Sequence, residues 1–194
     1  MEIGIVRKTG EHGKKGSLQS WVEEGYSIFS SEGPSSIQIE RVARNLNKNK
    51  SGFYYFFKDR DNFLECLMNE HLDRLNSLAF QIRGIKQFEP DYLNLSIDHL
   101  EVFFFQIQLV KNRETTLFQN TLSRFNSRIS AAVIPVWSDY LEVSIEVAEK
   151  LWGLTRDALY CRASKENFTY NWLLDLVNEA KLIGSYQNSP TLAY

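Results

Sequence analysis

The chain has 194 residues, of which 43% are hydrophobic and 24% are charged, an ordinary composition for a globular protein that buries a core. Its two cysteines, Cys66 and Cys161, are too far apart for a CxxC metal site and too few for a disulfide framework. No apolar run is long enough to span a bilayer or to form the core of a secretion signal. We therefore predict a cytoplasmic protein without a membrane partner.

The formal net charge of −2 hides an uneven distribution. Residues 1–60 carry ten Lys and Arg against seven Asp and Glu, a net +3, whereas the remaining 134 residues carry twelve against seventeen, a net −5. An excess of positive charge in one segment is typical of a nucleic-acid-binding unit, although basic residues on helices are often only a solvated face.

The N-terminal segment 1–16 holds four of the ten glycines and has no hydrophobic period, so we predict a flexible basic arm there. Ser17 is a suitable N-cap for the first helix. The apolar residues that follow have the spacing of one buried helix face: Leu18, Trp21, Val22, Gly25, Tyr26 and Phe29. Gly33 and Pro34 end this helix.

A short second helix and a tight turn come next. Ser35 and Gln38 have the spacing of a capping box. One apolar stripe follows them, made of Ile39, Val42, Ala43 and Leu46. Asn47 suits the left-handed conformation that ends a helix, and a third short helix is predicted from about Lys48 to Phe57.

Helical periods continue through the rest of the chain. A fourth, long helix runs to about Gly84, and its stripe consists of Leu64, Leu67, Met68, His71, Leu72, Leu75, Leu78, Ala79 and Ile82. Pro90 opens another helix, and further helices are predicted over 113–127, 129–142, 143–162 and 165–186. No segment alternates with period two between hairpin turns, so the predicted fold class is all-α.

The third helix carries a specific sequence signal. Phe53 and Phe57 are four residues apart and can anchor it, which leaves polar residues on its outer side. The stretch KSGFYYFFKDRDNFL at 50–64, with Val42-Ala43 before it, resembles the stretch "IA...G.s.gtlY.hF.sKe.Ll" of the TetR (tetracycline-repressor) family of transcriptional regulators. The resemblance covers about residues 17–68.

The resemblance implies a helix-turn-helix DNA-binding domain at 17–62, followed by a larger helical ligand-binding and dimerisation domain at 63–194. It implies a ligand-responsive repressor that binds a palindromic double-stranded DNA operator as a homodimer. The DNA-contacting positions carried over from the family are Ser36, Gln38, Lys48, Asn49, Lys50, Ser51, Gly52, Tyr54, Tyr55 and Arg60. Among them, Tyr54 and Arg60 would bind phosphates, while Lys50 and its neighbours would face base edges.

The sequence departs from the family pattern at several positions. Asn47 stands where glycine is usual, Phe56 stands where histidine or tyrosine is usual, and Gln38 stands where threonine is common. Lys48 replaces an apolar residue, so we expect it to extend outward and to form an additional phosphate contact.

The last two predicted helices carry apolar stripes suited to a dimer interface in a four-helix bundle. The candidate residues are Trp152, Leu159, Phe168, Trp172 and Leu176. The alternative is that these faces pack within their own monomer.

An internal pocket for an apolar or aromatic effector would be lined by His99, Phe103, Phe104, Gln106, Phe118, Trp137 and Tyr140. The alternative is that these aromatic residues are ordinary core. No cofactor or metal site is predicted. The sequence lacks HExxH, GxSxG and a glycine-rich phosphate loop, so we predict no enzyme. The rival function is a helical protein-interaction module that has lost DNA binding.

Overall fold

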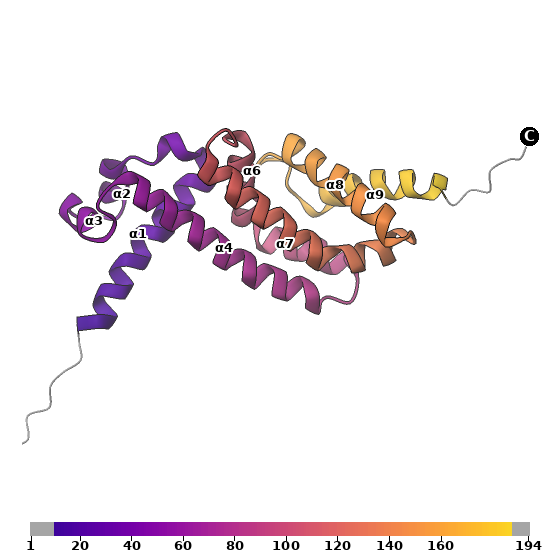
Figure 1. Ribbon diagram of the computed structural model, residues 1–194, viewed down its shortest axis with the longest axis horizontal. Helices are drawn as coiled ribbons and strands as arrows, with labels where there is room; N and C mark the ends of the chain where they lie inside the picture. Colours follow the sequence, from indigo (N-terminus) through magenta and orange to yellow (C-terminus); the bar gives the residue numbers. More distant parts are fainter. Residues whose placement is uncertain (1–9, 188–194) are drawn as a thin grey trace, which may run out of the picture.

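A computed structural model describes residues 10–187, and Figure 1 shows that they form a helical protein. The elements in chain order are α1 (Gly10–Glu32), η1 (Pro34–Ser36), α2 (Ile39–Asn45), α3 (Lys50–Phe57), α4 (Arg60–Gly84), η2 (Phe88–Tyr92), α5 (Leu93–Asp98), α6 (Leu100–Lys111), α7 (Thr116–Leu141), α8 (Ile145–Arg162) and α9 (Tyr170–Gln187). These residues contain no strand, so the all-α prediction is confirmed. None of the described helices has the length and apolar character needed to cross a membrane.

Two hydrophobic cores follow one another along the molecule. The first lies at the end formed by α1, α2 and α3, and the second lies toward α8 and α9 (Figure 1). Helix α4 belongs to both, because Phe63 and Leu67 are buried in the first core while Leu75 and Ile82 are buried in the second. The amphipathic stripe predicted for this helix therefore joins the two ends of the protein.

Helices α1 and α4 approach closely where α1 has no side chain. A Cβ atom on Gly25 would lie 2.3 Å from Cζ and 2.8 Å from Cε1 of Phe63, distances that real Cβ contacts do not show. The Phe63 ring is fully buried in the first core. Glycine at position 25 is thus required by packing and not by backbone conformation.

We expect Gly25→Ala to lower the free energy of unfolding by about 1–3 kcal/mol, because the added methyl group overpacks the core against Phe63. Gly153→Ala in α8 is the matched control, since a Cβ at Gly153 would meet no atom within 4 Å. The control should gain about 0.5–1 kcal/mol, the usual advantage of alanine in a helix. Chemical denaturation measures both. Equal effects of the two substitutions would contradict this account of the helix contact.

Two helix starts differ from the prediction. Helix α1 begins at Gly10, so residues 10–16 are helical and the predicted flexible arm is wrong for them; residues 1–9 lie outside the described part. Each glycine costs a helix about 1 kcal/mol but does not end it. Helix α3 begins at Lys50, because the Asn49 side chain accepts a hydrogen bond from the backbone N–H of Ser51 and acts as the N-cap.

The predicted capping box before α2 is also wrong. Ser35 lies in η1, where Pro34 at the first position favours a tight turn, and α2 starts only at Ile39. Gln38 occupies the N-cap of α2, and its side chain makes no capping hydrogen bond.

The later helices differ from the prediction in two places. Residues 116–141 form one helix, where we predicted two, 113–127 and 129–142; Pro135 lies inside it, as it did inside the second predicted helix. A proline inside a helix costs about 3 kcal/mol, but burying a large apolar side chain contributes about 1.5–3 kcal/mol, and α7 buries several on both sides of it. Pro90 lies within η2, and the helix predicted after it is divided at His99 into α5 and α6.

Candidate functional site

The turn between α2 and α3 has the geometry expected from its sequence. Asn47 has a φ of 52°, which confirms the predicted left-handed residue. Its backbone N–H donates to the carbonyl of Arg44 at 3.0 Å, and the N–H of Lys48 donates to the carbonyl of Ala43 at 2.8 Å. These bonds close the end of α2 and set the direction in which α3 leaves.

Helix α3 is held by two phenylalanines, as predicted. Phe53 is fully buried, with its ring centroid 5.7 Å from that of Trp21 and 5.1 Å from that of Phe63. Phe57 is 5% exposed, and its ring centroid lies 4.6 Å from that of Phe63. One face of α3 is therefore fixed to α1 and α4, which leaves the opposite face available for contacts with another molecule.

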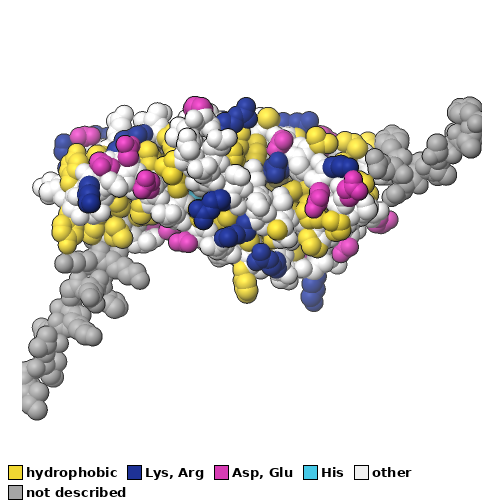
Figure 2. Space-filling model, viewed as in Figure 1, with side chains coloured by type: hydrophobic (Ala, Val, Ile, Leu, Met, Phe, Trp, Pro, Cys, Tyr) yellow, Lys and Arg dark blue, Asp and Glu magenta, His cyan; other side chains and the backbone are white. Residues whose placement is uncertain are grey.

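The opposite face of α3 presents polar and aromatic side chains. Lys50 and Ser51 are exposed, while Tyr54 and Tyr55 are 49% and 67% exposed. Tyrosines this exposed are unusual in a core-packed helix, and their hydroxyl groups can both donate and accept hydrogen bonds. Figure 2 shows acidic and basic side chains interspersed with hydrophobic ones at this end of the molecule. The face in view is therefore not uniformly basic.

Lys50 is paired within the protein. Its Nζ lies 3.0 Å from Oε1 of Glu40, an exposed ion pair that joins α3 to α2. The pKa of Glu40 is below its ordinary value, because its own backbone N–H and then Lys50 hydrogen-bond to the carboxylate. The ion pair uses one of the three N–H donors of the ammonium group, so a base or phosphate that binds Lys50 meets the carboxylate of Glu40 beside it.

Two of the residues predicted to contact phosphates, Lys48 and Arg60, form hydrogen bonds with other groups of the protein. The ammonium group of Lys48 donates a hydrogen bond to the hydroxyl of Ser20 and lies 5.6 Å from the ring centroid of Trp21, so it reaches toward α1. The Nε of Arg60 donates to the carbonyl of Ile37 at 2.9 Å, and its terminal nitrogen donates to the carbonyl of Pro34. Arg60 thus fastens η1 to the start of α4, an internal role that the sequence did not indicate.

The other predicted residues lie around the same turn. Ser36 is half-buried at the end of η1, and Gln38 is exposed at the start of α2. Asn49 uses its side chain as the cap of α3. A Cβ on Gly52 would face Trp21 at 3.6 Å, so this position points toward α1 and not outward.

Sequence reasoning missed two cations on this surface. Arg44 in the last turn of α2 and Lys58 directly after α3 are both exposed, and neither forms an ion pair with another described residue. Lys58 has a φ of 64°, in the left-handed region that ends α3. The signal was the excess of positive charge over residues 1–60, which does not show which of these side chains are exposed around the turn.

The second core contains a small cavity. Its volume is about 30 Å³. The lining is mostly apolar and consists of Phe88, Tyr92, Leu93, Ser96, Phe103, Phe125, Asn126, Ile129, Trp152, Thr155, Arg156, Leu159, Tyr160, Leu173, Leu176 and Val177. Such a space holds at most about two water molecules, so a larger guest requires the walls to move.

Most of the predicted pocket residues lie elsewhere, and only Phe103 lines this cavity. Phe118 belongs to the first core, while Phe104 and Trp137 are ordinary residues of the second. His99 is hydrogen-bonded to Gln81. Tyr140 lines a separate hollow beside η2, and Gln106 is buried against His71. Helical periodicity indicated buried faces here but not which of them enclose a space.

The predicted dimer residues also turn inward. Trp152, Leu159 and Leu176 line the cavity, and Phe168 packs on Phe103 with ring centroids 5.6 Å apart. Trp172 is half-buried against the second core. These stripes pack within their own monomer, the alternative that the sequence left open, so their assignment to a dimer face is corrected.

Different apolar side chains face outward on the last two helices. Leu154 on α8 is 64% exposed, and Leu182 and Ile183 on α9 are 59% and 53% exposed. A groove of about 250 Å³ runs between the two helices, with Leu154 and Ile183 among its lining. A hydrophobic groove with exposed rims is unusual on a monomer and typical of an interaction surface.

Two solved structures share this arrangement of helices. One, from Mesorhizobium loti, is assigned to the TetR family of transcriptional regulators; it has a TM-score of 0.56 and 12% identity over 88% of this chain and 97% of its own. The other, a TetR-family assignment from a Rhodococcus species, has a TM-score of 0.52 and 18% identity over 86% of this chain and 99% of its own. No protein-family model and no curated protein sequence matches the chain. The chain therefore has the fold of these two TetR-assigned proteins.

Proposed function

We propose that the chain is a DNA-binding transcriptional regulator that uses α3 as its recognition helix. The observation that carries the proposal is the two-sided character of α3. Phe53 and Phe57 fix one face in the core, while Lys50, Ser51 and Tyr55 are exposed on the other. A short, anchored helix with a polar outer face is what insertion into the major groove requires. The shared fold of the two TetR-assigned structures supports the same assignment.

Within this proposal, side chains have separate tasks. Tyr54 binds a phosphate through its hydroxyl, and Lys50 leaves Glu40 to donate to guanine O6 and N7. Further contacts with the DNA phosphate backbone come from side chains around the turn, those of Gln38, Arg44 and Lys58. The unit that binds DNA corresponds to 17–62, and 63–194 forms the effector and dimerisation domain.

The test is the salt dependence of binding to random-sequence duplex DNA, measured by fluorescence anisotropy. We expect the logarithm of the binding constant to fall with the logarithm of salt concentration by about 0.9 per phosphate contact. Tyr54→Phe should weaken binding to all sequences alike, whereas Lys50→Ala should change sequence preference. Binding that is absent at low salt, or that does not depend on salt, would leave the rival function, a protein-interaction module without DNA binding.

We also propose that the chain acts as a homodimer through the outward groove of α8 and α9. Two recognition helices must reach half-sites separated by about one helical turn of DNA, or a multiple of it, which requires two copies related by a two-fold axis. The exposed Leu154 and Ile183 supply the apolar centre that such an interface needs. The operator is then palindromic.

We propose a small apolar or aromatic effector for the cavity in the second core. The cavity is too small for such a molecule in this conformation, so the effector would favour a second conformation with its walls moved apart. We expect the effector to release the protein, acting as a repressor, from its operator. If the effector and the operator bind different conformations, binding of one lowers the affinity for the other.

A further inference from the structure

A chain of buried hydrogen bonds connects the cavity to the first helix. The hydroxyl of Tyr26 lies 2.7 Å from Nδ1 of His71, and Nε2 of His71 lies 3.0 Å from Oε1 of Gln106. The amide nitrogen of Gln106 donates to Oδ1 of Asn126 at 3.1 Å, and the hydroxyl of Tyr160 donates to the same oxygen at 2.7 Å. The five residues come from α1, α4, α6, α7 and α8. We call them the polar relay.

The donor and acceptor roles in the polar relay follow from the side-chain oxygen of Gln106. Because Oε1 of Gln106 can only accept, Nε2 of His71 carries the proton and donates to it. Nδ1 of His71 is then the acceptor for the hydroxyl of Tyr26. Every bond from Tyr26 to Asn126 therefore points the same way, and bonds in such a series polarise one another.

Aromatic stacking runs beside the polar relay. The ring of His71 lies between those of Phe105 and Phe125, with centroids 4.3 Å and 4.9 Å away, and Phe105 stacks on Tyr26 at 4.3 Å. On α4, the guanidinium of Arg74 lies 3.8 Å from the ring centroid of Tyr26 and forms ion pairs with Glu70 and Glu101. The rings packed on His71 restrict its movement, so a change in its position has to involve its neighbours as well.

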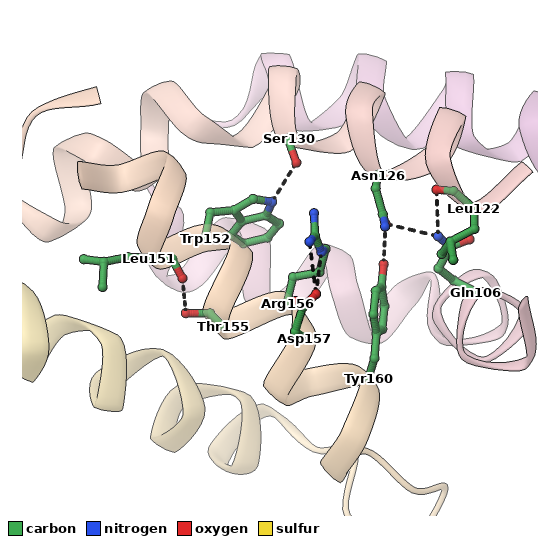
Figure 3. A network of polar contacts seen from close by, with 10 residues as sticks. All are labelled: Gln106, Leu122, Asn126, Ser130, Leu151, Trp152, Thr155, Arg156, Asp157 and Tyr160. Atoms are coloured by element: carbon green, nitrogen blue, oxygen red, sulfur yellow. Dashed lines mark hydrogen bonds and ion pairs between the residues drawn. The ribbon is translucent and has the colours of Figure 1, made fainter. Parts of the chain in front are cut away.

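The far end of the polar relay lies at the cavity. Asn126, Tyr160 and Phe125 all line it. Figure 3 shows Tyr160 of α8 and Gln106 of α6 converging on Asn126 of α7. Asn126 and Arg156 also line a hollow on the outside of α7 and α8, so only a thin wall separates the cavity from the surface here.

Burying this many polar groups has a cost. Tyr26, His71 and Gln106 are each 0% exposed, and an apolar core of the same shape would need none of their hydrogen bonds. A satisfied polar chain in a core does, however, specify one arrangement of the helices that carry it. In this protein the helices of the polar relay connect the cavity to α1, on which α3 packs through Trp21 and Phe53.

We propose that the polar relay transmits the state of the cavity to α1. The inference rests on the proposed function of the chain as a ligand-responsive regulator, and it assigns the route of that response. A guest that takes a hydrogen bond from Tyr160 removes one of the two donors on Asn126. The bonds of Gln106 and His71 then readjust, and the change reaches Tyr26, which is buried in the first core.

A double-mutant cycle tests this coupling. Tyr26→Phe and Tyr160→Phe each remove one hydroxyl from opposite ends of the polar relay and leave the rings in place. We expect the unfolding equilibrium constant of the double variant to differ by at least about threefold from the product of the single effects, as for residues in one network. The matched control pairs Tyr26→Phe with Tyr92→Phe, because Tyr92 lines the same cavity outside the polar relay. The control should be additive within about twofold. Additivity in both pairs would overturn the proposal.

A second measurement does not need the double variant to fold. Nuclear magnetic resonance of the His71 ring in the full chain should show a proton on Nε2. The Tyr160→Phe variant should shift the His71 ring nitrogen resonances, whereas Tyr92→Phe should not. Unchanged His71 resonances in Tyr160→Phe would overturn the proposal. Both measurements are made without DNA, so their result is independent of whether the chain proves to bind DNA.

Discussion

Leu154→Asp is expected to convert the proposed homodimer to a monomer and to lower the apparent affinity for operator DNA by about 10²-fold or more, because two linked half-site contacts become independent. Leu154 is 64% exposed on α8 and lines the groove between α8 and α9. An aspartate there would place a charge in the apolar centre of the proposed interface, and the cost of removing that charge from water strongly disfavours association. Analytical ultracentrifugation measures the mass, and anisotropy with duplex DNA selected from a random pool measures the affinity.

Phe80→Asp is the matched control for this experiment. Phe80 is 77% exposed on α4, outside the α8 and α9 groove, and the substitution adds the same charge to the surface. It should leave both mass and affinity unchanged. A dimer that persists in Leu154→Asp, or is lost equally in Phe80→Asp, would place the interface elsewhere on the molecule.

Acidification from about pH 6 to pH 4 is expected to destabilise the protein through His71 by about 1.4 kcal/mol per pH unit, the linkage value for one proton. Burial lowers the pKa of His71 to about 3, against an ordinary value of 6.5, although the hydrogen bond with Gln106 acts in the opposite direction. In this range the unfolded chain holds one more proton than the folded chain. Stability therefore rises with pH and is lost as the pH falls below 6.5.

The comparison of interest is the pH dependence of unfolding in the wild type and in His71→Phe. The variant keeps an aromatic ring between Phe105 and Phe125 but has no proton to bind, and the other histidines and the carboxylates are the same in both proteins. Denaturant titrations at several pH values give the free energy of unfolding as a function of pH. Between about pH 4 and pH 6 this free energy should rise more steeply with pH in the wild type than in the variant. Parallel slopes would mean that His71 is protonated in the folded protein.

The helical framework was predictable from the sequence because it depends on local patterns. Apolar spacing predicted α4 to its end at Gly84, and the four-residue separation of Phe53 and Phe57 predicted the buried face of α3. The left-handed Asn47 was predictable because few residues tolerate that conformation. Each of these features depends on residues close together in the chain.

Features that depend on distant contacts were not predictable. Arg60 binds carbonyl groups of η1, and Lys48 reaches Ser20 on α1, contacts that no spacing within one helix reveals. An apolar stripe such as that of α8 indicates a buried face but not what covers it, so the inward-facing Leu159 and Leu176 were assigned to a dimer interface and the exposed Leu154 was not considered. The polar relay joins five helices and has no local signature. Periodicity predicted only that His71 would be buried.

The first core is completed by residues from far along the chain. Phe105 and Leu109 of α6 and Phe118 of α7 are buried in it, and Phe105 stacks on both Tyr26 and Phe29. The unit formed by α1, α2 and α3 therefore cannot be exchanged between proteins without the later helices that complete its core. A chimaera joined at residue 62 would cut through this core and would have to supply new aromatic partners for α1, whereas a junction that kept α6 and the start of α7 would preserve them.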